Sequence, residues 1–549
     1  MKRNLLSVAI GSAAAMSLNT VNAAMYVNEA GTGETLLFPF YTAENGNNTL
    51  INIVNATNDH KAVKVRMIEA QNSQEVLDFN LYLSPQDHFS FAISETPESV
   101  NNAGVVGGAK LVTRDKSCTS PTIPEDGEPF RTLLFGENDE NNGVTRTQVG
   151  YIEVIEMGQL DPNAAPVIDK EGLASGNAIN AAAAITHGSN GIPANCDIVN
   201  FAWGTSGGED GVWKAEARAS QLGRSEMLAN WSGGGLYGYA TVINVPQGAS
   251  FGYDAIAIAD HVADGATGYA MHYTPGLNLP NFTDPAMDTS AIVSLNGQAV
   301  TLDFSGDYPS SAVERIQAMN ATIMATEIYN DYVTDPDYGM TTDWLLTFPT
   351  KAFHVNGTEP IQPFSQQWVG NSACEPAAFY SVDREESRPA DPPAPGPSGP
   401  DFSPAPPTPP GPAPSNNDVP LCYESTIIQF ATESAAGTSQ VAVGVNPFLE
   451  AENGWAVISF DPQQIASTLG KCDIDGDDTT NVDAKEPCTR TIDAGDGQLI
   501  GLPVVGFAVQ KFVNGDADGT GILANYAIST AHKRCRSGTG TVSNDCSAR

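Results

Sequence analysis

The chain has 549 residues, of which 41% are hydrophobic and 16% are charged, and its net charge at pH 7 is −38. This apolar content is sufficient for folded cores and excludes a mainly disordered acidic protein. The negative charge repels nucleic acid and anionic lipid headgroups, which disfavours both as partners, and we expect no nucleic-acid partner. We expect the charge to serve solubility outside the cell, or attraction for divalent cations.

The first 23 residues have the pattern of a signal peptide. Lys2 and Arg3 precede an apolar run at residues 5–18, and residues 21–23 supply small side chains for cleavage. The apolar run is too short to span a membrane, and no later stretch replaces it. We therefore expect an exported mature chain that begins near Ala24, without a transmembrane segment, at the cell surface, in the extracellular space or in the periplasm.

The cysteines are even in number and form no CxxC motif, which favours disulfides in an oxidising compartment over a zinc ribbon or a thioredoxin-type site. The simplest pairing joins neighbours in sequence. The eight residues are Cys118, Cys196, Cys374, Cys422, Cys472, Cys488, Cys535 and Cys546.

The segment from Thr35 to Ile93 predicts antiparallel strands. Residues 62–67 and 76–83 alternate apolar and polar side chains, and so do residues 89–93. This period of two indicates strands with one buried face, so we expect Lys64 and Arg66 to face outward. The fold class that follows is mainly β, a β-sandwich of immunoglobulin-like or jelly-roll type.

Residues 24–110 are thus the first sandwich portion, and residues 111–385 predict a mixed, β-rich middle region with short helices. The expected helices are residues 175–186, 214–228 and 312–329, and the expected strands are residues 149–155, 198–203, 236–245, 253–259 and 343–351.

A proline-rich tract at residues 386–420 cannot bury a core and predicts an extended segment. It is either a linker between domains or a surface loop closed at its base by Cys374 and Cys422. Residues 421–549 again predict strands. They form a separate domain, or they complete the sandwich that begins at Thr35.

Three apolar strings carry a resemblance to known proteins: Leu37-Phe-Pro-Phe-Tyr41, Gly150-Tyr-Ile-Glu-Val-Ile-Glu-Met157 and Asp343-Trp-Leu-Leu-Thr-Phe-Pro-Thr-Lys351. The chain resembles a loosely defined group of exported proteins of Gram-negative bacteria, described as hypothetical or cell-surface proteins. The resemblance implies a surface or extracellular location and supplies no catalytic motif.

Two patterns of catalytic or ligand residues stand out in the middle region. Gly204-Thr-Ser-Gly-Gly208 matches the nucleophile elbow and resembles the serine segment of trypsin-like proteases, but residues 207–211 are a poor helix start. Asp260, His261, Asp264 and His272 offer metal ligands at a spacing that fits no standard site, so we interpret them as surface loop residues.

We therefore expect a non-enzymatic, exported structural or interaction protein, whose partners are other surface or extracellular proteins or further copies of itself. One alternative is an extracellular hydrolase that uses Ser206. The other is a carbohydrate- or ligand-binding module with an aromatic platform from residues such as Trp203, Trp231 or Trp368.

The acidic segment between Cys472 and Cys488 predicts the one cofactor that we name, calcium. Calcium prefers oxygen ligands at alternating positions, closed by a glutamate. Thr480 stands where an EF-hand requires glycine, so we expect a looser loop, or simply an acidic turn. The candidate ligands are Asp473, Asp475, Asp477, Thr479, Asn481, Asp483 and Glu486.

If this segment binds calcium, millimolar calcium should raise the melting temperature of the wild-type protein, because the ion relieves repulsion between the carboxylates. The Asp475→Ala/Asp477→Ala double variant should gain less. A thermal-shift series with and without calcium makes the comparison. Equal gains in both proteins would show that this segment holds no calcium.

Overall fold

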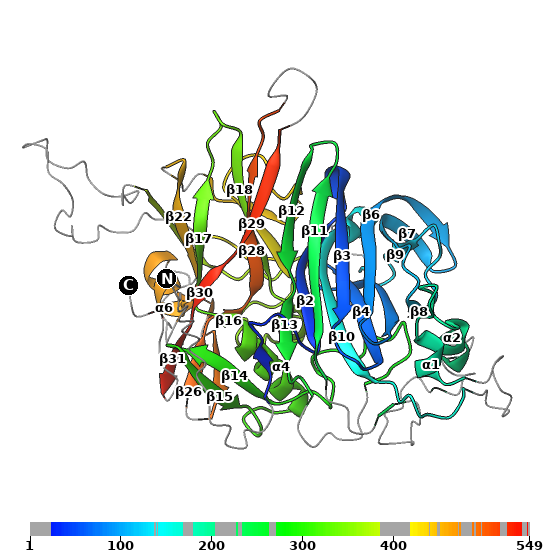
Figure 1. Cartoon of the computed structure of the whole chain (residues 1–549). Coiled ribbons are helices and arrows are strands. Elements are labelled where there is room, and N and C mark those ends of the chain that lie inside the picture. Colours follow the sequence, from blue (N-terminus) through cyan, green and yellow to red (C-terminus); the bar gives the residue numbers. More distant parts are fainter. Residues whose placement is uncertain are drawn as a thin grey trace, which may run out of the picture.

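The computed structural model describes residues 24–136, 139, 141–167, 179–203, 213, 227–228, 233–262, 271–384, 418–438, 440–446, 449, 451–469, 472–473, 486–487, 490–495, 497–515, 524–540 and 546. Layered, mostly antiparallel sheets are the main regular structure of this part of the chain (Figure 1). The predicted mainly β class is confirmed.

Two sheets that pack face to face form what we call the N-terminal pair. Its core includes Phe38, Phe79 and Phe89, which come from both sheets. The seven-stranded sheet consists of β1 (Tyr26–Val27), β13 (Ile256–Ala259), β2 (Thr35–Thr42), β10 (Val149–Gln159), β4 (Lys61–Glu69), β5 (Glu75–Leu83) and β8 (Cys118–Ser120), in that order. The six-stranded sheet consists of β12 (Ala249–Asp254), β11 (Leu236–Asn244), β3 (Asn47–Asn55), β6 (His88–Asn101), β7 (Gly104–Val112) and β9 (Glu128–Arg131).

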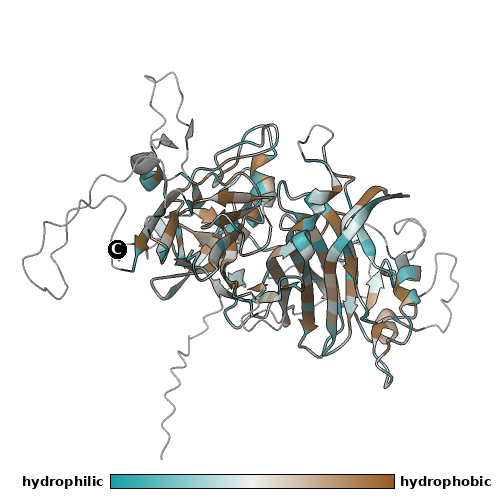
Figure 2. Cartoon of the chain, turned by 90° about the horizontal axis from the view of Figure 1, so that it is seen from above, coloured by the Kyte–Doolittle hydropathy of each residue, from teal (hydrophilic) through white to brown (hydrophobic). Residues whose placement is uncertain are grey.

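The alternation in the sequence places side chains into this core. Phe79 of β5 meets Phe89 and Phe91 of β6 edge-on, with ring centroids 6.0 and 6.4 Å apart. Figure 2 shows hydrophilic and hydrophobic residues alternating along the strands of this pair. Period-two patterns therefore predicted these strands correctly.

The outer face of the seven-stranded sheet is covered by a second layer. Tyr82 and Met157 pack there against Trp203 and Met319. Lys64 and Arg66, expected to face outward, are buried, so that prediction was wrong. The alternation in one strand does not reveal whether a distant segment covers its polar face. The regular elements of this layer are α1 (Ala181–Ile185), α2 (Asp197–Trp203), α4 (Ser311–Ile323), β14 (Ser290–Leu295) and β15 (Gln298–Asp303).

Two further sheets form the C-terminal pair, around a core that includes Trp344, Phe379 and Phe430. Strands from the end of the chain pair here with β17 and β18. Phe507 and Val509 of β28 also pack against the core of the N-terminal pair. One sheet consists of β21 (Ala442–Gly444), β20 (Ser425–Gln429), β18 (Met340–Thr347), β28 (Val505–Phe512) and β29 (Tyr526–Ala531). The other consists of β19 (Ala378–Asp383), β22 (Asn453–Ser459), β17 (Glu327–Val333) and β30 (Lys533–Cys535).

Shorter elements connect these layers, and three predicted elements are corrected. Residues 198–203 are helical, and α4 ends at Ile323, where the chain turns into strands. The strand expected at residues 253–259 divides at Ala255, because β12 and β13 belong to different sheets. The remaining elements are η1 (Glu44–Gly46), η2 (Val144–Gln148), α5 (Lys351–Val355), α6 (Pro462–Leu469), β16 (Met324–Ala325), β27 (Leu502–Pro503), β23 (Cys472–Asp473), β24 (Glu486–Pro487), β25 (Thr491–Ala494), β26 (Gly497–Ile500) and β31 (Ser537–Gly540).

The two pairs meet along what we call the seam. Thr347 Oγ1 of β18 donates a hydrogen bond of 2.6 Å to the carbonyl of Pro39 in β2. Phe507 of β28 stacks on Tyr253 of β12, with ring centroids 4.4 Å apart. The strings that carry the resemblance lie in β10, β2 and β18, at or beside this seam. Their apolar residues therefore have a structural role.

Disulfides join neighbouring cysteines: Cys118–Cys196, Cys374–Cys422 and Cys535–Cys546. These three pairs are as predicted, and they indicate an oxidising, exported environment. Strands on both sides of the proline-rich tract share sheets, because β18 pairs with β20 and β19 with β22. The linker interpretation was therefore wrong. Among the described residues, no helix is long and apolar enough to cross a bilayer.

Asp343, at the start of the third string, is a buried carboxylate in β18. Its Oδ2 accepts hydrogen bonds from Ser434 Oγ at 2.6 Å and from the Ala436 amide at 2.9 Å. The Ala436 carbonyl in turn accepts a bond from Asn47 of the N-terminal pair. Burial raises the pKa of Asp343 to about 6, although these hydrogen bonds lower it.

A cut in the proline-rich tract should not release the two parts of the chain. A recognition site for a specific protease, inserted between residues 386 and 417, provides the cut. Under native conditions the fragments should stay together even after reduction, because they share sheets. In denaturant, reduction should be needed to separate them. Size-exclusion chromatography and non-reducing gels test this, and fragments that separate under native conditions would contradict it.

Breaking the disulfide itself should lower the stability of the uncut protein. Closing a loop with a sequence separation of 48 residues contributes about 4 kcal/mol in the loop-closure model.

Asp343→Asn should change how stability depends on pH. The pKa of about 6 in the folded state exceeds the ordinary 3.8, so Asp343 lowers stability as pH rises from about 4 to about 6. This loss amounts to about 3 kcal/mol at most. Relative to wild type, the variant should therefore gain stability between about pH 4 and about pH 7, measured by urea unfolding. Asp337→Asn, an exposed control, should show no such gain. A pH-independent difference for Asp343→Asn would refute the assignment.

Candidate functional site

The ends of the predicted calcium segment lie close together. Cys472–Asp473 and Glu486–Pro487 form the parallel pair of β23 and β24. The other five candidate ligands and the side chains of Asp473 and Glu486 lie outside the described residues. The calcium site therefore stays a prediction.

The catalytic and transition-metal patterns do not form a site within the described part. Ser206 and Asp264 lie outside it. His261 and His272, expected in surface loops, are buried and have different partners. His261 Nδ1 lies 2.6 Å from Thr35 Oγ1, whereas His272 Nε2 lies 3.0 Å from the Tyr82 hydroxyl. Both rings are covered because their segments pack onto the seven-stranded sheet.

The tryptophans proposed for an aromatic platform do not form one where they are described. Trp203 is buried, packs on Trp213 at 5.3 Å and donates a hydrogen bond of 2.8 Å to the Tyr82 hydroxyl. Trp368 packs against the core of the C-terminal pair, and Trp231 lies outside the described residues. Trp203 is a core residue because α2 carries it onto the sheet.

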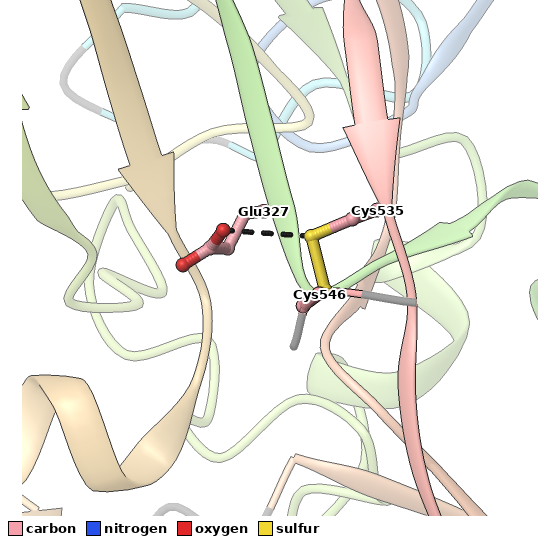
Figure 3. A group of neighbouring side chains, drawn as sticks. All are labelled: Glu327, Cys535 and Cys546. Atoms are coloured by element: carbon pink, nitrogen blue, oxygen red, sulfur yellow. Dashed lines mark hydrogen bonds between the residues drawn. A yellow bond between two sulfur atoms is a disulfide. The ribbon is translucent and has the colours of Figure 1, made fainter. Parts of the chain in front are cut away.

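One group with metal-ligand chemistry is present in the described part: Glu327, Cys535 and Cys546 (Figure 3). The two sulfurs form a disulfide, and Cys535 Sγ lies 3.4 Å from Glu327 Oε2. A disulfide sulfur has neither a proton to donate nor a thiolate to bind a metal ion. This group therefore consists of a disulfide, which links Cys546 to β30, and a neighbouring carboxylate.

A groove of about 480 Å³ lies at the seam between the two pairs. Tyr239, Thr241 and Asp254 line one wall, from β11 and β12. Gly506 and Ser529 line the facing wall, from β28 and β29. In Figure 1, the pair of β28 and β29 lies beside β12 and β11 at this position.

Strand pairing positions the polar side chains of the groove. The register of β11 with β12 places Tyr239 opposite Asp254 and Thr241 opposite Gly252. Ser529 Oγ donates a hydrogen bond to the carbonyl of Gly252 and so holds β29 against β12. The two edges meet through side chains, without forming one continuous sheet, and this leaves the groove.

The base of the groove is closely packed. Tyr253 and Phe507 stack there, and the Tyr253 hydroxyl donates a hydrogen bond to the Phe40 carbonyl. Gly506 has a φ of +153°, and a Cβ atom at this position would lie 1.9 Å from the Leu345 carbonyl oxygen. A larger residue would force β28 away from β18, so glycine is required here.

Beside the groove, the outer face of the six-stranded sheet presents aromatic and amide groups. Tyr237 and Tyr239 alternate along β11, and they are 38% and 42% exposed. Asn52 of β3 lies opposite Tyr239, and its Oδ1 is 3.0 Å from His88 Nε2. The groove thus continues onto a surface that offers ring faces and hydrogen-bonding groups.

The groove lining offers contacts for binding, without a set of groups for acid–base catalysis. Its hydroxyls belong to tyrosine, Thr241 and Ser529, and Asp254 is its one ionisable side chain other than tyrosine. Burial raises the pKa of Tyr253, which keeps that phenol protonated. Most glycoside hydrolases use a pair of carboxylates, and the groove lining contains one carboxylate, that of Asp254.

Comparison of the chain with protein-family models, curated proteins and solved structures gives no match. The sequence interpretation identified β11 and missed the groove. Tyr237, Tyr239 and Thr241, at alternate positions of that strand, were the available signal. The sequence indicated that these side chains share one face of the strand. It could not indicate the groove, because the facing strand, β29, lies almost 300 residues further along the chain.

Proposed function

We propose that the protein is an exported, non-enzymatic interaction protein that binds a neutral carbohydrate chain in the seam groove. The observation that carries this proposal is the exposed Tyr239 ring beside Asp254 at the groove. Aromatic faces accept the C–H surface of a sugar ring, and a carboxylate accepts hydrogen bonds from neighbouring hydroxyls. A few placed polar groups on a largely apolar surface are typical of ligand sites.

Charge and shape support this ligand class. The net charge of −38 opposes binding of acidic polysaccharides and leaves neutral chains unaffected. The groove is open and adjoins Tyr237, so a chain longer than one sugar has a surface on which to continue. These features favour a polymer or a long oligosaccharide over a single small molecule.

The signal-peptide pattern, the disulfides and the resemblance to exported Gram-negative proteins support a location at the cell surface or outside the cell. We infer that the two sheet pairs are β-sandwiches, because each encloses its own core between facing sheets. Assignment to the immunoglobulin-like or jelly-roll type remains a proposal. No observation in the described part of the chain favours a hydrolase that uses Ser206.

Tyr239→Ala should weaken carbohydrate binding roughly tenfold, because an aromatic contact of about 1.4 kcal/mol is lost. An array of neutral and acidic oligosaccharides would identify the ligand, and calorimetry would measure the affinity of both proteins. Tyr338→Ala is the matched control, since Tyr338 is 66% exposed and does not line the groove. Binding of acidic glycans alone, or equal effects of the two substitutions, would contradict the proposal.

A further inference from the structure

A second cavity, of about 280 Å³, lies on the outer face of the seven-stranded sheet and shares no lining residue with the groove. The turn between β4 and β5 forms one side of it, through Asn72, Ser73 and Gln74. Residues 278–283 and 349–356 supply the facing sides, and Arg66 and Glu153 belong to its lining. Segments from five separate parts of the chain therefore enclose one polar space.

Arg66, in the wall of this cavity, is shared between two carboxylates. Arg66 donates from Nε to Glu75 at 2.7 Å and from Nη1 to Glu153 at 2.6 Å. Its Nη2 donates to Asn278 Oδ1. The Arg66, Glu75 and Glu153 side chains are 7%, 12% and 4% exposed. Two shielded carboxylates thus share one guanidinium, and of these two Glu153 lines the cavity.

The polar atoms left without a partner here are hydrogen-bond acceptors. Asn72 Oδ1 is buried and has no donor. Glu153 accepts a hydrogen bond from Arg66 at Oε2, and its Oε1, on a side chain that is 4% exposed, accepts none from a described residue. By contrast, the hydroxyls of Ser73 and Tyr151 lie 2.7 Å apart and satisfy each other. A ligand that complements this wall must bring donors.

A buried carboxylate that shares its guanidinium is costly to the protein without a ligand. Burial raises the pKa of Glu153, and Arg66 only partly offsets this effect. A cation placed beside Glu153 would supply a positive charge and a donor together, and such charge-assisted hydrogen bonds are the strong ones. The acidic protein as a whole also attracts cations toward its surface.

From the two unmatched acceptors and the shared guanidinium, we propose that this cavity binds a small organic molecule that carries a primary ammonium group. The ammonium group lies at Glu153 Oε1 and Asn72 Oδ1. The remainder of the molecule lies against Phe282 and Phe353, which also line the cavity. A volume of about 280 Å³ is at the small end for ligand sites, so the ligand is compact.

Calorimetry with 4-amino-1-butanol and 1,4-butanediol tests this proposal on the mature chain. The two probes have the same length and differ in one group, amine against hydroxyl. We expect the amine to bind and the diol to bind at least tenfold more weakly. Glu153→Gln should weaken amine binding at least tenfold, whereas Glu98→Gln, at an exposed position of β6, should leave it unchanged.

A second variant tests the proposal without breaking a buried ion pair, in case Glu153→Gln does not fold. Asn72→Ala removes one acceptor in a turn and leaves the Arg66 ion pairs in place, and it should weaken amine binding at least threefold. Circular dichroism and melting temperature establish whether each variant is folded. Equal binding of amine and diol would overturn the proposal, as would Asn72→Ala binding like wild type. Binding of calcium alone, with the same loss in Glu153→Gln, would also overturn it in favour of an inorganic cation site.

Discussion

The structure depends on a sheet that is buried on both faces. β4 and β10 lie near the centre of the seven-stranded sheet, and their charged side chains are largely shielded from water. Lys61 and Glu156, both 0% exposed, therefore pair with each other, and the Gly234 amide satisfies the second Glu156 oxygen. Arg146 meets Glu69 in the same way. Removing one partner of such a pair typically costs about 3–5 kcal/mol, because the other charge stays buried without compensation. The covering layer on this sheet is therefore compatible only with paired charges beneath it.

The seam follows from a second constraint, the joining of two sheet pairs without a continuous sheet. β18 contacts β2 through Thr347 and the Pro39 carbonyl. Lys351, just beyond β18, is buried and donates to the carbonyls of Leu421 and Tyr423. The segment from Thr347 to Lys351 thus contacts the N-terminal pair and also holds the residues that follow the proline-rich tract. The groove remains where the edges of β12 and β29 approach without pairing.

Both proposed binding surfaces arise where packing is incomplete. The groove lies between two sheet edges, and the Arg66 cavity lies between the sheet and its covering layer. The first presents ring faces and hydroxyls, and the second presents unmatched acceptors next to negative charge. Their chemistry differs because their linings differ. The groove lies at the outer surface, whereas the cavity is lined by Arg66 and Glu153, charged side chains on the covered face of the seven-stranded sheet.

The sequence by itself determined β4, β5 and the first part of β6, because alternation such as that of Leu77, Phe79 and Leu81 is a local property of the chain. The three described disulfides also followed from cysteine order. The tertiary structure alone decided that Lys64 and Arg66 are buried and that α4 ends at Ile323. It alone brought Tyr239 to Ser529 and Asn72 to Glu153. The reason is physical: periodicity records which side of a strand is apolar, whereas burial of its polar side and the meeting of distant edges depend on long-range packing.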